Sequence, residues 1–108
     1  MSAGKSASQT GHAFVGAFVT ATSKRPEAVR HYHSQFPQSP GTKVVLSANA
    51  EQINRLCAAL EQTSIPFFVV YDSGCPNFFN GERILTGVGF GPVEEKEVPS
   101  IAKKMRLL

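Results

Sequence analysis

The chain is poor in the residues that stabilise small proteins through disulfides or bound metal. Its 108 residues contain two cysteines, Cys57 and Cys75, and no tryptophan. Two thiols are too few for a disulfide framework, and no cysteine and histidine pair has the spacing of a zinc site. We therefore predict a reducing compartment and no metal site.

Acidic residues are absent from the first 26 positions, and long apolar runs are absent altogether. The apolar run from Ala13 to Ala21 is too short to cross a bilayer, so we expect no transmembrane helix and no membrane partner. A start without acids, with several serines and an apolar run behind Lys5, is also typical of a cleavable presequence. We expect a cytoplasmic protein, and a mitochondrial or secretory leader is the alternative.

Length and charge limit the size and the partners of the protein. A chain of 108 residues forms one domain, 1–108, with a real core. The net charge of +3 is concentrated in the first half. The charged residues before position 50 are Lys5, Lys24, Arg25, Arg30, Lys43 and Glu27. This asymmetry favours phosphates or an acidic partner, but only weakly, because dedicated nucleic-acid binders carry denser basic patches.

The first residues carry three polar groups at helical spacing. Lys5, Gln9 and His12 stand at i, i+4 and i+7, so a helix over residues 5–22 places a cation, an amide and an imidazole on one face. A neighbouring stripe predicts the face that packs on a sheet: Ala13, Phe14, Ala17 and Phe18. The structural alternative is a solvated lysine, a glutamine that only favours the helix, and a partly buried histidine ring.

The rest of the chain alternates amphipathic helices with short apolar runs, which predicts a layered α/β domain. Asn49 and Gln52 predict a capping box at the start of a helix. The expected elements are helices over 26–34, 50–62 and within 93–104, the last restarted at Pro99, and strands over 43–47, 67–71 and 84–90. We expect these strands in one sheet crossed by the 50–62 helix, and residues 105–108 as an apolar tail.

Asp72 ends an unbroken apolar run, residues 67–71, and starts a glycine-containing loop. Such a run predicts a central strand that is covered on both faces. In α/β sheets, ligands bind at strand ends, so Asp72 is a candidate functional carboxylate. The structural alternative is a turn-starting carboxylate that caps nearby amides.

The order of several motifs resembles that of the second, archaeal and eukaryotic type of peptidyl-tRNA hydrolase over nearly the whole chain. No single motif decides this resemblance, but their order does. The matching segments are Gly4-Lys5, Ala7-Ser8-Gln9, His12-Ala13, Lys43-Val44-Val45-Leu46, Asp72-Ser73-Gly74, Gly87-Val88-Gly89 and Met105-Arg106-Leu107-Leu108.

The resemblance implies a three-layer α/β/α fold with a small mixed sheet. It also implies an enzyme that hydrolyses the ester between a peptide and the 3'-terminal ribose of tRNA without a metal or cofactor, with peptidyl-tRNA as its partner. Asp72 would orient or deprotonate the water, and Lys5 would stabilise the oxyanion or hold the terminal phosphate. The remaining expected site residues are His12, as a further catalytic group, and Gln9, Asn77 and Arg83, as substrate-binding groups.

Two departures from the family pattern leave alternatives open. The family's apolar strand before the Gly-Lys motif has no counterpart after Met1, so an earlier start, a homodimer or a partner chain would complete the sheet. In addition, Pro76 and Ile84 replace two threonines implicated in the family's site. A slow enzyme and a non-catalytic paralogue that binds tRNA, the ribosome or a protein partner through the same cleft are both compatible with these replacements.

Overall fold

A computed structural model describes residues 2–72 and 84–108 of the chain. The elements are α1 (Ala3–Lys24), α2 (Pro26–Tyr32), β1 (Leu46–Ser47), α3 (Ala50–Glu61), β2 (Phe67–Asp72), β3 (Ile84–Phe90), the 3-10 helix η1 (Glu95–Glu97), α5 (Ser100–Lys103) and β4 (Arg106–Leu107). The protein is a small α/β fold, as the alternation of helices and strands predicts. None of the helices described is long and apolar enough to cross a membrane.

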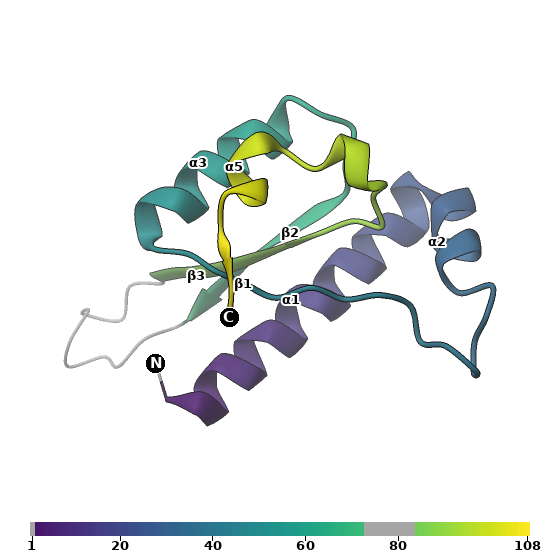
Figure 1. Cartoon of the computed structure of the whole chain (residues 1–108), viewed down its shortest axis with the longest axis horizontal. Coiled ribbons are helices and arrows are strands. Elements are labelled where there is room, and N and C mark those ends of the chain that lie inside the picture. The colour runs from purple at the N-terminus through teal and green to yellow at the C-terminus, as the bar shows by residue number, and fades with distance from the viewer. Residues whose placement is uncertain (1, 73–83) are drawn as a thin grey trace.

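The antiparallel pair of β2 and β3 lies between two helical layers (Figure 1). The long helix α1 packs on both strands from one side, and α3 with α5 covers the other side. The core on the α3 side is formed by Leu56, Leu60, Ile65 and Ala102, with partly buried apolar side chains from β2 and β3 around them. The predicted three-layer arrangement is therefore present around a very small sheet.

The helices begin where their capping residues predict. The Ser2 side chain accepts the Lys5 N–H at the start of α1, and Pro26 occupies the first turn of α2. Asn49 and Gln52 form the predicted capping box, in which each side chain accepts the other residue's backbone N–H at 2.8 Å. The C-terminal helical segment restarts after Pro99, as expected.

The predicted single sheet was wrong. In the described part of the chain, β1 pairs with β4 and β2 pairs with β3, and both pairs are antiparallel, so no mixed sheet is formed there. Residues 105–108 are accordingly not a simple tail, because Arg106 and Leu107 pair with Ser47 and Leu46. The pair comprises only two residues from each side.

The predicted burial of residues 67–71 on both faces was also wrong. Val70 is buried under α1, but Phe68 and Tyr71 keep 41% and 47% of their surface exposed. β2 is an edge strand in the described structure, so only part of its apolar run is covered. An apolar run alone does not distinguish a central strand from an edge strand beside a helix.

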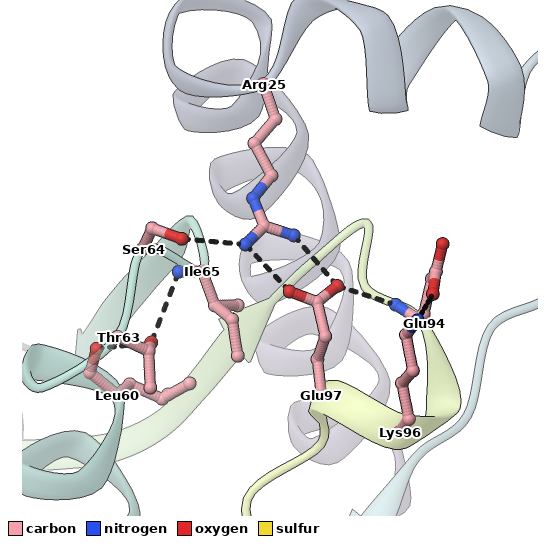
Figure 2. Close-up of polar contacts among 8 residues, drawn as sticks. All are labelled: Arg25, Leu60, Thr63, Ser64, Ile65, Glu94, Lys96 and Glu97. Atoms are coloured by element: carbon pink, nitrogen blue, oxygen red, sulfur yellow. Dashed lines mark hydrogen bonds and ion pairs between the residues drawn. The ribbon is translucent and has the colours of Figure 1, made fainter.

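Arg25 lies between α1 and α2 and forms hydrogen bonds to residues on the other side of the β2–β3 pair. Its guanidinium donates to both carboxylate oxygens of Glu97, at 3.2 and 3.0 Å, and to the Ser64 hydroxyl at 3.0 Å (Figure 2). The Glu97 carboxylate also accepts the backbone N–H of Glu94. The hydrogen bond from Arg25, followed by that from Glu94, lowers the pKa of Glu97 below its usual range.

We expect the stabilisation from Glu97 to disappear at acid pH. A carboxylate with a lowered folded-state pKa contributes stability above its unfolded pKa, about 4.3, and loses that contribution as the pH falls through the folded-state value. The Glu97→Gln variant should therefore unfold more easily than the parent at pH 7 and become similar to it at the acid end of a urea titration series. Glu95→Gln, on the same turn, is the matched control. A stability difference that does not change with pH would contradict this prediction.

Candidate functional site

The N-terminal half of α1 carries three of the predicted site residues. Residues 3–24 form one helix, so Lys5, Gln9 and His12 have the predicted helical register. The side chains of Lys5 and His12 are largely exposed, whereas Gln9 is half-buried against the sheet. The structure therefore places three chemically different groups on the N-terminal half of one helix.

Small residues bring α1 unusually close to the two strands. Gly16 faces the Phe68 ring, and a side-chain carbon added at position 16 would overlap that ring. A carbon added at Gly89 would overlap the backbone carbonyl of Ala13. Ala17 and Ala21 of the same helix are buried. These small residues thus allow a short distance between α1 and the two strands. This distance also determines how far the site residues on α1 lie from the strands.

Gln9 contacts a residue that the sequence alone did not identify. The Thr86 hydroxyl, on β3, lies 3.1 Å from Gln9 Oε1 and 3.3 Å from the Val70 carbonyl oxygen, and it can donate to either acceptor. When the amide oxygen of Gln9 accepts this proton, its NH₂ group remains available to another acceptor.

A register shift in the β2–β3 pair explains why Thr86 reaches α1. Val70 pairs with Gly87, but Tyr71 pairs with Leu85, so Thr86 is the extra residue of a bulge. A bulge re-aims side chains that regular alternation would direct elsewhere. The adjacent Gly87 is the only hint in the sequence, because glycines within a strand often mark such irregularities.

Asp72 is the last residue of β2 and pairs with Ile84 at the start of β3. It is the only aspartate of the chain, and it lies at a strand end as the sequence predicts. The preceding residue, Tyr71, lines a groove together with His12 of α1. The backbone of Asp72 therefore follows directly on the part of β2 that neighbours His12.

The groove lies between one side of α1 and the free side of β2. It has a volume of about 390 Å³ and is lined by His12, Val15, Gly16, Phe68, Val69, Val70 and Tyr71. A larger hollow of about 640 Å³ lies between α3, η1 and α5 and contains none of the predicted site residues. The groove beside His12 is therefore the hollow that can extend the candidate site.

Several of the predicted functional residues cannot be compared with the structure. Asn77 and Arg83, predicted to bind substrate, lie outside the described residues, as do Cys75 and the rest of the glycine-containing loop that follows Asp72. Within the described ranges, no group of three histidine, cysteine, aspartate or glutamate residues is arranged to hold a metal ion. Burial and the nearby Glu61 raise the pKa of the Cys57 thiol, so its thiolate is a minor species at neutral pH.

Comparisons with known proteins agree over the full length. The sequence pattern of one family, Peptidyl-tRNA hydrolase PTH2, matches residues 1–108. The chain is 29% identical to a peptidyl-tRNA hydrolase of Methanococcus vannielii over 109 residues, which cover all of this chain and 89% of the relative. It is 28% identical to that of Methanocaldococcus jannaschii, again over all of this chain and 90% of the relative.

Proposed function

Because the chain belongs to the Peptidyl-tRNA hydrolase PTH2 family, a family of hydrolases, we propose that it cleaves the ester between a peptide and the 3'-terminal ribose of tRNA and releases free tRNA. The observation that carries this proposal is the geometry of α1. Lys5, Gln9 and His12 lie in the N-terminal half of α1. The helix α1 packs against β2, the strand that ends at Asp72.

The chemistry requires a positioned water, a proton acceptor and a group that stabilises the oxyanion. Asp72 would orient or deprotonate the water, and Lys5 would stabilise the carbonyl oxygen as it becomes negative. His12 and the NH₂ group of Gln9 would position the ester. Asn77 and Arg83 complete the proposed set as further substrate contacts.

Thr86 supports the proposed role of Gln9 in substrate positioning. Pro76 and Ile84 remove two hydroxyls that the family resemblance implies, but Thr86 brings a hydroxyl to Gln9 from the neighbouring strand. We propose that this hydroxyl holds the Gln9 amide in the orientation that presents its NH₂ group to the substrate. The proposed function is tested directly by the release of peptide from purified peptidyl-tRNA. Binding of tRNA without cleavage above buffer would favour the paralogue.

Lys5→Ala separates the two roles that a cation can have in this site. If Lys5 holds the terminal phosphate, the variant should bind tRNA more weakly, and the slope of log affinity against log salt should become shallower by about one. If Lys5 stabilises the oxyanion, turnover should fall about 10²–10³-fold at nearly unchanged affinity. Lys24→Ala, at the other end of α1, is the matched control. Affinity, salt slope and turnover that all remain unchanged would remove Lys5 from the mechanism.

The Thr86→Val variant tests the orientation of Gln9. Loss of one hydrogen bond of about 0.5–1.5 kcal/mol should lower kcat/KM for peptidyl-tRNA about two- to tenfold, and Thr86→Ser should restore it. In a Gln9→Ala background, Thr86→Val should have almost no further effect, because the group that it positions is gone. Additive losses in the double variant would show that Thr86 does not act through Gln9.

The finer assignments of partner and location are also proposals. We propose that residues 1–108 act as one domain in the cytoplasm, with mitochondria as the alternative compartment. β2 and β3 each have a partner on one side only in the described part of the chain, so a second copy or a partner chain can add a strand. Light scattering of the purified protein separates a monomer from a homodimer.

A further inference from the structure

Within residues 2–72 and 84–108, no strand pairs with the outer side of β2, whose backbone groups point away from β3. The Gly91 N–H donates to the Pro66 carbonyl at 2.9 Å, which fixes this pair as a hydrogen-bonded one. Hydrogen-bonded and non-bonded pairs alternate in an antiparallel ladder, so Phe68 and Val70 bond to β3 whereas Phe67 and Val69 direct their N–H and C=O groups outward. This edge can accept another extended chain.

The surface beside this edge is apolar and uncharged. The groove between α1 and β2 includes Val15, which is 64% exposed, and Phe68, which is 41% exposed. Among the described residues that line the groove, His12 and Tyr71 are the titratable ones, and none is a lysine or arginine that could neutralise phosphates. This described lining favours a neutral extended peptide over the backbone of a nucleic acid.

We propose that the free edge of β2 and this groove bind the peptide part of the substrate as an added β-strand. The inference rests on the proposed function, in which the scissile ester lies near His12 and the end of β2. The groove is continuous with that position, because His12 and Tyr71 both line it. The peptide is therefore the part of the substrate that can enter the groove without displacing the tRNA end.

The direction of the bound peptide follows from the chemistry of the ester. The ester is formed by the peptide's C-terminal carbonyl, so the C-terminus must lie at the Asp72 end of β2 and the rest must extend back towards Phe67. The peptide then runs parallel to β2. At about 3.3 Å per residue, the six residues of β2 offer room for about four or five peptide residues. Pairing through the backbone would make binding largely independent of the peptide's sequence.

A pair of substrates of different length tests this site. We expect the chain to cleave both N-acetyl-aminoacyl-tRNA, with one residue, and a tetrapeptidyl-tRNA with the same C-terminal residue. The KM for the tetrapeptide substrate should be lower by about tenfold, because only its peptide is long enough to pair with Val69. Equal KM values for the two substrates would overturn the inference while leaving the proposed function intact.

Val69→Pro tests the edge itself. Proline removes the outward N–H of Val69 but none of the bonds to β3, and edge strands tolerate it at such positions. Val69→Pro should have the same KM for the tetrapeptide and one-residue substrates, so the length preference is lost, and its KM for the one-residue substrate should equal the parent's. Val69→Ala should keep the parent's KM for both substrates. A length preference that survives Val69→Pro would exclude this edge. Circular dichroism melting of both variants shows whether they are folded. If Val69→Pro is misfolded, a tetrapeptidyl-tRNA with an N-methylated peptide backbone removes the same hydrogen bonds from the substrate side.

If neither substrate is cleaved, the proposed function fails, and non-hydrolysable 3'-amide analogues of the two substrates decide on the docking site. Affinities that differ about tenfold and become equal in Val69→Pro would support it, and equal affinities in the parent would overturn it. A second copy of the chain is the competing occupant of the edge. It would make the length preference disappear as the protein concentration is raised through the dimerisation range, which would overturn peptide docking as the main role of the edge.

Discussion

Replacement of Asp72 by asparagine is expected to lower the turnover of peptidyl-tRNA by at least about tenfold, with little change in tRNA affinity. General acid–base assistance contributes about 10²–10⁴-fold in typical enzymes, and asparagine cannot accept the proton of the attacking water. The carboxylate is proposed to act on the water rather than on a phosphate, so the loss should be confined to the chemical step. Single-turnover kinetics and tRNA binding, measured on the same preparations, separate the two effects.

A carboxylate of the same charge on another element provides the control. Glu51→Gln, in the first turn of α3, removes one negative charge on the opposite side of the β2–β3 pair and should leave turnover unchanged. If Asp72→Asn instead cleaves at the parent's rate, Asp72 is only the turn-starting residue that its sequence position also allows. If Asp72→Asn binds tRNA more tightly and cleaves more slowly, the carboxylate repels phosphate as well as assisting the water.

Local signals in the sequence predicted the first three helices and the strands over 67–71 and 84–90 well, whereas the strand expected over 43–47 is reduced to Leu46–Ser47 and the last helix to Ser100–Lys103. The start of α3 follows from Asn49 and Gln52, whose side chains satisfy backbone N–H groups within one turn. The restart after Pro99 follows from the geometry of proline. Such signals act between residues a few positions apart, so no knowledge of the tertiary structure is needed to interpret them.

Strand pairing was not predictable in the same way. Leu46 pairs with Leu107, a residue far along the chain, and neither segment contains a signal for the other. The exposure of Phe68 was missed for a related reason, since its covering depends on which elements pack beside β2. Side-chain contacts across the fold are properties of the assembled structure, and a single sequence does not encode them in any short window.

The candidate site shows the same difference between local features, which the sequence predicts, and contacts between distant segments, which it does not. Helical spacing correctly placed Lys5, Gln9 and His12 on α1, because periodicity is a local property. Thr86 was missed, because regular alternation along β3 gives no reason to aim it at Gln9. Its position depends on the bulge opposite Val70 and Tyr71. The sequence therefore predicted that the three candidate residues lie on one helix, and the structure adds a residue of the sheet that contacts one of them.

Gly89 lies directly against the backbone of α1, so one added methyl group there should have a large effect on the fold. An added carbon at Gly89 would meet the backbone carbonyl of Ala13, and a backbone atom in the middle of a helix cannot rotate away. We expect Gly89→Ala to lower the free energy of unfolding by about 3 kcal/mol, the upper end of typical overpacking costs. That is a large part of the about 5–15 kcal/mol available to a domain.

Gly87→Ala, two residues earlier on β3, is the matched control, because an added carbon there meets no atom within 4 Å. Urea unfolding of the two variants should therefore differ, with Gly87→Ala close to the parent. Gly89→Ala should also lower kcat/KM for peptidyl-tRNA under conditions where it is still folded, since lifting α1 moves Gln9 away from Thr86. Equal stability of the two alanine variants would contradict the close approach, and a destabilised Gly89→Ala with full activity would show that the site tolerates a shift of the helix.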